Sequence, residues 1–183
     1  MSFQNQSAFV SPDFIIRAAT LAWEQAGAEA LRHQVFVREQ GIFTGHDRDA
    51  IDDFAMPLVA ISTYASEADQ VVGTVRIHED APGQWRGSRL AVATSHRRIG
   101  SLGAELIRLA VSTANGQGCD RFLAHVQVQN VPLFKRLRWT PVKEVDLHGV
   151  PHMEMSADLE FYPAIADPAC GWKTLGRRRR RRA

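Results

Sequence analysis

Apolar and polar positions along this chain repeat with two different periods. Period two, or a short continuous apolar run, predicts strands over residues 14–20, 58–65, 71–78, 88–93, 121–128, 139–147 and 151–159. Helical spacing of apolar residues predicts helices over residues 23–40, 102–115 and 131–137. The polar residues 66–70 predict a hairpin turn between the second and third strands. This order predicts one domain over residues 13–163, between a disordered N-terminus (1–12) and a tail (164–183).

Charge is distributed unevenly along the chain. Its 183 residues have a net charge of +2, but six consecutive arginines, Arg177 to Arg182, stand near the C-terminus. Without them 16 basic residues face 20 acidic ones, so the remainder has a net charge of −4. Blocks of like charge are normally solvated tails, and no aromatic residue is interleaved with these arginines to stack on bases. We therefore do not expect specific nucleic-acid binding.

The composition is that of a soluble globular protein, with 45% hydrophobic and 23% charged residues. No apolar run approaches the roughly 18 residues of a membrane span, and no basic segment followed by an apolar one opens the chain. Two cysteines, Cys119 and Cys170, form no CxxC, and seven scattered histidines form no HExxH. We expect a cytoplasmic protein without membrane association and without a metal site.

The most informative local pattern is a basic turn with glycines, HRRIGSLG, at residues 96–103. It lies between a predicted strand and a strongly amphipathic helix, whose N-terminus presents unpaired backbone N–H groups and a partial positive charge. Gly100 and Gly103 permit close approach to the backbone. Arg97 and Arg98 add full positive charge. The turn therefore predicts a site for a pyrophosphate, although turn formation and solubility alone would also explain these residues.

This strand, turn and helix resemble the acyl-CoA-binding motif of the GCN5-related N-acetyltransferases, written [QR]-x-x-G-x-[GA]. Arg97 and Gly100 match the motif, Leu102 stands at the position of the small residue, and Gly103 follows directly. The order of elements over residues 13–161 is also that of this family. The resemblance implies an α/β (α+β) fold with a mixed, mostly antiparallel sheet of about six to seven strands flanked by helices.

Residues 31–40, LRHQVFVREQ, and the aspartates that follow resemble the opening of a branch of these acyltransferases and, more loosely, of acyl-homoserine-lactone synthases. The resemblance places Arg32, Glu39 and Asp52 over the site of the acyl acceptor. Ordinary ion pairing is the alternative reading of each of these residues.

Residues 122–139 resemble the strand, asparagine and helix with which the family continues. Asn130 aligns with an asparagine that contacts the pantetheine arm or caps the next helix. Phe134 stands where many members have the tyrosine that protonates the departing thiolate. Phenylalanine cannot donate a proton, so Tyr162, Tyr64 or a water would have to replace that tyrosine.

The resemblance implies an enzyme that transfers an acetyl group from acetyl-CoA to a primary amine of a small molecule, by direct attack in a ternary complex. It also implies that the sheet opens after its fourth strand, where the exposed backbone grips the pantetheine and polarises the thioester carbonyl. The cofactor-binding residues that follow are Leu90, Ala91, Val92, Arg97, Arg98, Ile99, Gly100, Ser101, Leu102, Gly103, Asn130 and Phe134.

Four residues are candidates for the catalytic base, His125, Glu79, Asp80 and His78, of which His125 and Glu79 are preferred. Strand alternation places His125 on one face with Gln127 and Gln129, opposite an apolar face. Histidine titrates near neutral pH, which suits deprotonation of an amine. Glu79 and Asp80 end a predicted strand, where an acid can face the acceptor. A hydrogen-bonded structural histidine and a solvated turn are the alternative readings.

Other classes of function stay open. A non-catalytic acyl-CoA-binding or partner-binding module is favoured by Phe134 and Leu102, and a nucleic-acid-associated protein would use the arginine tail. A preference for long acyl donors would indicate acyl-homoserine-lactone-synthase-like activity. Residues 108–139 resemble acetyltransferase domains found beside an aminoimidazole-ribonucleotide (AIR)-synthase-like domain in bacterial gene clusters with a nitrilase, which implies an AIR-synthase-like protein partner. The sequence leaves a homodimer open.

Overall fold

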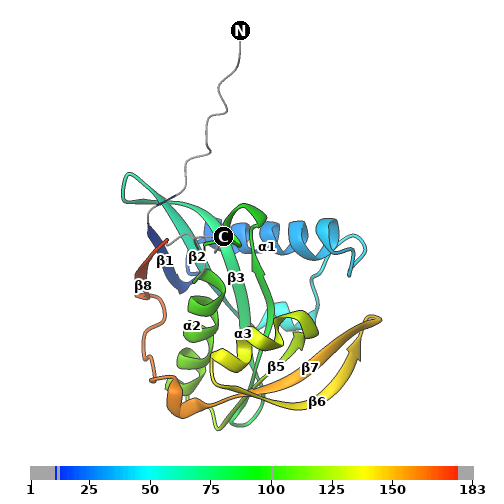
Figure 1. Ribbon diagram of the computed structural model, residues 1–183. Coiled ribbons are helices and arrows are strands. Elements are labelled where there is room, and N and C mark those ends of the chain that lie inside the picture. The colour runs from blue at the N-terminus through cyan, green and yellow to red at the C-terminus, as the bar shows by residue number, and fades with distance from the viewer. Residues whose placement is uncertain (1–10, 12, 100, 177–183) are drawn as a thin grey trace, which may run out of the picture.

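The computed structural model describes residues 11, 13–99 and 101–176. Gly100, the arginines Arg177 to Arg182 and nearly all of the segment 1–12 lie outside the described residues. The described strands form one sheet in the order β6-β7-β5-β4-β3-β2-β1-β8 (Figure 1). They are β1 Asp13–Ala18, β2 Met56–Tyr64, β3 Glu67–Ala81, β4 Gln84–Val92, β5 Arg121–Gln127, β6 Trp139–Leu147, β7 Val150–Ala157 and β8 Trp172–Leu175.

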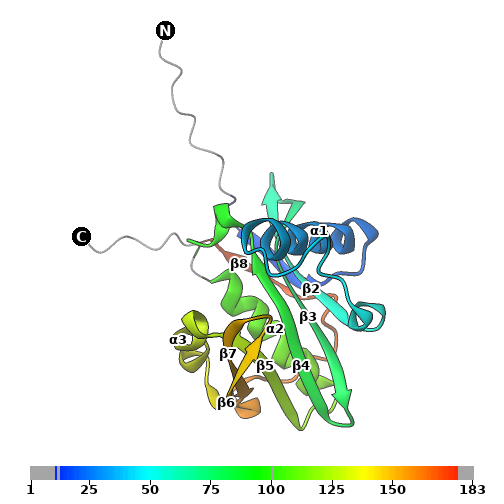
Figure 2. The same cartoon turned by 90° about the vertical axis from the view of Figure 1, so that its right-hand side faces the viewer.

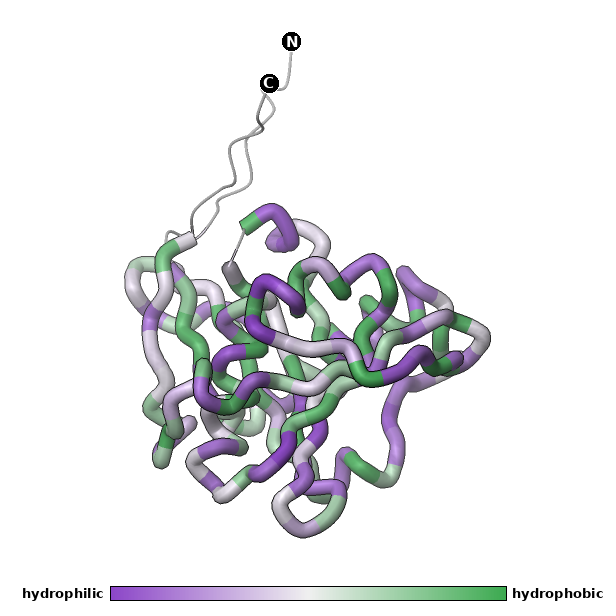
Figure 3. Tube along the Cα trace, turned by 60° about the horizontal axis from the view of Figure 1, so that its bottom comes forward, coloured by the Kyte–Doolittle hydropathy of each residue, from purple (hydrophilic) through white to green (hydrophobic). Residues whose placement is uncertain are grey.

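Neighbouring strands are antiparallel except for the parallel pair of β4 and β5. The predicted fold class is confirmed, with eight strands instead of six or seven. Hydrophobic and hydrophilic residues alternate along much of the chain trace (Figure 3), as expected for strands that present alternate side chains to opposite faces.

Helices cover both faces of the sheet. The helix α2 (Leu102–Gly116) packs on the face that carries Phe14, Ile16 and Leu58. The helix α1 (Ala22–Arg32) packs on the opposite face, where Ala28 meets Ile15, Val59 and Ile61 (Figure 2). Adjacent residues of one strand thus enter different cores. A third, short helix, α3 (Val131–Arg136), follows β5.

The helix predicted over residues 23–40 is present over nearly that length, but its winding changes part of the way along. After Arg32 the chain continues as a π-helix, His33–Glu39, in which the N–H of Gln40 bonds to the carbonyl of Val35 at 3.0 Å. A π-helical turn contains one extra residue and occurs frequently at functional sites. Val35 and Phe36 are buried, as the apolar spacing of an ordinary helix also predicts, so that spacing gives no signal of the extra residue.

The predicted hairpin between β2 and β3 is present, but its turn is shorter than the predicted residues 66–70. β2 extends to Tyr64 and β3 begins at Glu67, so the turn consists of Ala65 and Ser66, both with positive φ (51° and 70°). A two-residue turn of this kind matches the twist of the strands. The polar residues after it extend the hairpin into solvent, and an exposed strand has no apolar alternation that would reveal it.

The predicted tail contributes a strand. β8 pairs antiparallel with β1, Ile16 opposite Trp172, and the indole N–H of Trp172 donates to Glu105 of α2 at 2.8 Å. Gly171 before it has a φ of +55°, and a Cβ there would lie 1.9 Å from the carbonyl oxygen of Ile16. The chain therefore packs on the domain beyond residue 163. Four residues at a sheet edge are too short to predict a strand from periodicity.

Candidate active site

The site is built where two neighbouring strands part. β4 and β5 are paired from Gln84–Arg121 to Gly87–Ala124. Beyond these residues β4 pairs with β3 and β5 pairs with β7, but not with each other. The edge of β4 over residues 88–92 therefore carries backbone N–H and C=O groups that no strand binds on that side. The opening of the sheet that the family resemblance implies is present.

A bulge bends β4 at the same place. Thr74 of β3 faces Ala91, whereas Arg76 faces Ser88, so β4 has one residue more than β3 here. Arg89 within the bulge has a φ of 56°, which costs a non-glycine residue roughly 1–3 kcal/mol. Bulges redirect side chains and are frequent next to active sites.

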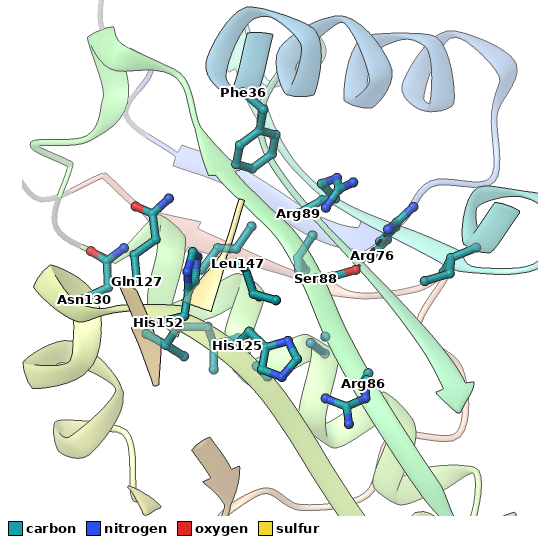
Figure 4. Close-up of a pocket in the computed structure, with 18 of the residues that line it drawn as sticks. Phe36, Arg76, Arg86, Ser88, Arg89, His125, Gln127, Asn130, Leu147 and His152 are labelled. Atoms are coloured by element: carbon teal, nitrogen blue, oxygen red, sulfur yellow. Dashed lines mark hydrogen bonds between the residues drawn. The ribbon is translucent and has the colours of Figure 1, made fainter. Parts of the chain in front are cut away.

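A cavity of about 470 Å³ occupies the space between the parted strands (Figure 4). Residues of β3, β4, β5, α2, α3, the β6–β7 hairpin and the segment after α1 line it. Four of the residues singled out in the sequence are among the lining residues: Leu90, His125, Asn130 and Phe134.

The turn before α2 has an open surface. Ile99 and Leu102 are buried in the core, so the side chain of Leu102 points away from the exposed end of the helix. A Cβ built on Gly103 would meet no atom within 4 Å. The leucine at the motif's small position therefore does not obstruct this surface, and Gly103 leaves it accessible. Ser101 is half-buried at the N-terminus of α2.

Arg97 links this turn to the end of the π-helix. Its Nη2 lies 2.6 Å from Oε2 of Glu39, and its Nε donates to the carbonyl of Val92 at 2.9 Å. The hydroxyl of Thr94 also donates to Glu39, at 2.9 Å. The hydrogen bond from Arg97, followed by that from Thr94, lowers the pKa of Glu39. Arg98 is exposed and is not among the residues in contact with the cavity.

Asn130 and Phe134 contact the cavity from the start of α3. Asn130 is the N-cap residue of this helix, yet its side chain makes no capping hydrogen bond. Helix capping therefore does not account for this asparagine. Phe134 is buried, with its ring 5.0 Å from that of Trp139 in an edge-on arrangement.

Neither of the chain's two tyrosines contacts the cavity. The hydroxyl of Tyr162 donates to the carbonyl of Leu137 and accepts from the indole of Trp139 at 3.0 Å. Burial raises the pKa of Tyr162 to about 12. Tyr64 lies at the tip of the β2–β3 hairpin. Neither tyrosine is therefore placed to donate the proton that many family members supply from a tyrosine at the position of Phe134.

His125 belongs to a row of charged groups across β5, β7 and β4. Its Nε2 lies 3.3 Å from Oε1 of Glu154, which faces it on β7. Arg86 of β4 bridges Glu154 at 3.2 Å and Asp80 at 2.8 Å. Figure 4 shows the imidazole of His125 and the guanidinium of Arg86 at the same end of the cavity. With Asp80 of β3, the four residues connect four neighbouring strands of the sheet.

The pKa values in this row favour a neutral imidazole beside an ionised carboxylate. Burial lowers the pKa of His125, and Arg86 lowers it further against the opposing charge of Glu154. Burial alone would raise the pKa of Glu154, but Arg86, Lys143 and His125 hold it below its usual range. An ionised carboxylate only accepts hydrogen bonds, so it selects the tautomer with a proton on Nε2 and a free lone pair on Nδ1.

The structure places Glu79, the second catalytic candidate, outside the cavity. Its carboxylate accepts from the backbone N–H of Gly83 at 2.9 Å and thereby closes the β3–β4 turn. The adjacent Asp80 lines the cavity instead. Strand alternation explains the difference, because neighbouring residues point to opposite faces. Of the two acids that the sequence offers at this strand end, the preferred one, Glu79, points away from the cavity and the other, Asp80, lines it.

Arg32 and Asp52, predicted to contact the acceptor, pair with each other and do not line the cavity. Arg32 is buried and binds Asp47 at 2.7 Å and Asp52 at 2.5 Å. Arg76 is buried and binds both carboxylate oxygens of Asp49, at 2.7 and 2.8 Å. These residues fasten the loop 47–53 to the end of α1 and to β3.

The same network reaches the cavity through other residues. Arg89 lies 3.1 Å from Asp47 and 3.1 Å from Asp49, and Arg76 lies 2.7 Å from Asp52. Burial alone would raise the pKa of Asp52, but its hydrogen bonds from Arg32, the Asp49 backbone and Arg76 hold it far below its usual range. Three arginines thus compensate three aspartates, and the cavity receives their polar groups without a large net charge.

The outer wall of the cavity was not foreseen from the sequence. The guanidinium of Arg89 lies 4.3 Å above the ring of Phe43, and His148 of the β6–β7 turn contacts the same ring edge-on at 5.0 Å. His152 of β7 also lines the cavity, as Figure 4 shows. The positive φ of His148 (55°) and of Arg89 arises from the folded chain and has no signal in residue spacing.

No group of three His, Cys, Asp or Glu residues within the described part of the chain is placed to hold a metal ion. The helices found among residues 11, 13–99 and 101–176 are too short or too polar to cross a membrane.

Known proteins resemble this chain in sequence and in fold. A Bacillus subtilis (strain 168) protein named uncharacterized N-acetyltransferase YjcF is 28% identical over 130 residues, which cover 70% of this chain and 88% of YjcF. A crystal structure from Lactobacillus plantarum has a TM-score of 0.71 at 23% identity, covering 80% of this chain and 98% of that one. The CoA-dependent acyl-homoserine lactone synthase BjaI has a TM-score of 0.62 at 20% identity, covering 80% and 83%. These two solved structures share the fold of this chain. The family model described as acetyltransferase (GNAT) family matches residues 18–137. The chain therefore belongs to the GNAT family of N-acetyltransferases.

Proposed function

We propose that this N-acetyltransferase transfers an acetyl group from acetyl-CoA to the primary amine of a small molecule, by direct attack within a ternary complex. The observation that carries the proposal is the cavity between the parted strands β4 and β5, with an edge of β4 that no strand binds on one wall and His125 on another. Acyl-CoA supplies an activated acyl group as a thioester, so a covalent enzyme nucleophile is not needed.

Several features fit an acyl-CoA ligand. The open surface at Gly103 and the positive charge of Arg97 and Arg98 suit its phosphates at the N-terminus of α2. The free edge of β4 at residues 90–92 suits the amide groups of a pantetheine arm and the polarisation of a carbonyl. Asn130 has no capping role and can donate to that arm, while Phe134 packs against it. Ile99 and Leu102 support the turn from the core.

His125 is the proposed general base. Its lowered pKa keeps the imidazole neutral at pH 7, and Glu154 directs the lone pair of Nδ1 away from itself. In the reaction the amine nitrogen forms a bond to the acyl carbon, the carbon–sulfur bond breaks, and the products are an amide and a thiol. The proton lost by the nitrogen passes to His125, and the thiolate takes a proton from His125 or from water.

The acceptor side favours a small molecule. Phe43, with Arg89 and His148 on its ring, closes the outer wall opposite the parted strands. Apolar side chains of Phe36, Ile51 and Leu147 line the same space, and the carboxylate of Asp49 offers a partner for an ammonium group. The AIR-synthase-like partner stays a prediction, and the question of a homodimer stays open.

A thermal-shift titration tests the cofactor first. Acetyl-CoA and desulfo-CoA should both raise the melting temperature, by roughly 5–10 °C at about 100 times the dissociation constant, whereas ATP should not. A screen of small primary amines with acetyl-CoA, monitored by release of free thiol, then tests the reaction. No shift with either CoA ligand at millimolar concentration would contradict the proposal.

A further inference from the structure

The cavity continues through the sheet. On β5, His125 and Gln127 face the acceptor side, whereas Phe122, Ala124 and Val126 belong to the core beneath α2. Residues of both sets line the same cavity. A continuous sheet would separate them, so the passage exists because β4 and β5 are no longer paired beyond Gly87 and Ala124.

The inner end of this passage, which we call the inner arm, is apolar. Its walls are Val75, Ile107, Ala110, Phe122 and Trp139, all of which are buried in the main core. The polar atom among these side chains, the indole N–H of Trp139, already donates to Tyr162. The inner arm therefore provides dispersion contacts and no hydrogen-bonding partner, which suits an aliphatic group and disfavours a polar one.

The position of the inner arm relates it to the acyl end of the donor. The proposed phosphate site is at the start of α2, and Ile107 and Ala110 lie roughly 9 and 14 Å further along this helix from Ser101, at about 1.5 Å per residue. A ligand that enters at the turn and follows the free edge of β4 reaches Gly87 and the inner arm with its far end. That end is the acyl group.

We propose that the inner arm binds a linear aliphatic acyl chain, so that the enzyme accepts longer donors such as butyryl-CoA beside acetyl-CoA and binds them more tightly. The inference rests on the proposed function, because it assumes that the cavity holds acyl-CoA. A single acetyl methyl leaves most of the apolar walls without a partner. Each additional methylene buried there raises affinity about fourfold.

Isothermal titration calorimetry tests this without an acceptor. Acetyl-, butyryl-, hexanoyl- and octanoyl-CoA are titrated into the full-length protein, with desulfo-CoA as the reference for the shared part of the ligand. The dissociation constant should fall about 15-fold from acetyl-CoA to butyryl-CoA, since two methylenes are added. Equal affinities, or affinity that falls from acetyl-CoA onward, would overturn the inference.

Ala110→Leu fills the inner arm and should reduce the ratio of acetyl-CoA to butyryl-CoA dissociation constants to about 1. Ala114→Leu is the matched control, because Ala114 is equally buried on the same helix but does not line the cavity. This control should keep the ratio of the wild type. Melting curves report whether each variant folds, and Ala110→Val provides a smaller change if the leucine variant does not fold.

Activity assays separate this inference from the proposed function. Thiol release with an amine acceptor is measured for the same four donors. Chain-length-dependent binding without transfer from any donor would reject the proposed reaction and retain the inner arm. Transfer from acetyl-CoA with no gain in binding for butyryl-CoA would reject the inner arm and retain the reaction.

Discussion

The cofactor side and the acceptor side of the cavity draw their residues from the chain in opposite ways. Most of the cofactor side comes from one continuous stretch, the second half of β4, the basic turn and α2, and the start of α3 completes it. The acceptor side combines Phe36, Asp49, Arg86, His125 and His148, which come from five separate segments.

The two sides also differ in what holds them together. Backbone separation and apolar packing build the cofactor side, where Leu102 and Ile107 are buried in the main core. A compensated network of arginines and aspartates builds the acceptor side, with Arg32 and Arg76 buried within it. The difference teaches that a local motif encodes the cofactor side, whereas the acceptor side depends on how distant segments of the chain are aligned with one another. Variants on each side should therefore fail in different ways.

The largest effect should come from removing the base on the acceptor side. His125→Asn should lower kcat by about 10²–10⁴-fold, because the amine loses its proton acceptor. Binding of desulfo-CoA should change little, since the phosphate and pantetheine contacts lie elsewhere. Steady-state thiol release and calorimetry measure the two quantities.

Glu79→Gln is the matched control for this variant. Glu79 closes the β3–β4 turn outside the cavity, so kcat should stay within a small factor of the wild type. A loss of activity in Glu79→Gln similar to that in His125→Asn would contradict the assignment of the base.

The next effect concerns the stability of the acceptor side. Arg76→Ala removes the buried arginine that binds Asp49 and one of the two that bind Asp52, whereas Arg89 and Arg32 stay in place. The free energy of unfolding should fall by up to about 3 kcal/mol, because one buried ion pair is broken while the network is only partly lost. Urea denaturation measures this change. Arg48→Ala removes ion pairs with Glu29 and Asp53 on the surface and should cause no measurable loss. Equal losses in both variants would show that burial of the network does not matter.

The pH dependence sharpens the role of the charged row. Arg86 lowers the pKa of His125 and Glu154 raises it. The acidic limb of kcat/KM, where protonation of His125 abolishes activity, should therefore move to higher pH in Arg86→Gln and to lower pH in Glu154→Gln. A rate profile from about pH 5 to 9 detects both shifts. Shifts in the same direction would show that Arg86 and Glu154 do not set the pKa of His125 in the way proposed.

The smallest effect tests the cofactor side. Gly103→Ala should stabilise the free protein by up to about 1 kcal/mol, because alanine favours a helix and the new methyl meets no atom within 4 Å. The same methyl should weaken binding of desulfo-CoA, since it projects from the surface proposed for the phosphates. Thermal melting and calorimetry measure the two changes. Unchanged desulfo-CoA affinity would place the phosphates elsewhere.

Several features could be predicted from local sequence. Apolar spacing identified α2, and the glycines and arginines before it identified the turn, because both depend on residues close together in the chain. The order of strands and helices agreed with the fold class. His125 faces the cavity, as the alternation along β5 predicted.

Tertiary structure alone decided the remainder. Arg32 and Asp52 pair with each other, because the loop 47–53 folds back onto the sheet. Asp80 replaces Glu79 at the cavity, because the parity at the end of β3 depends on its pairing with β4. Such contacts join residues far apart in the chain, and their geometry depends on strand register and on a bulge, neither of which is encoded in the spacing of neighbouring residues.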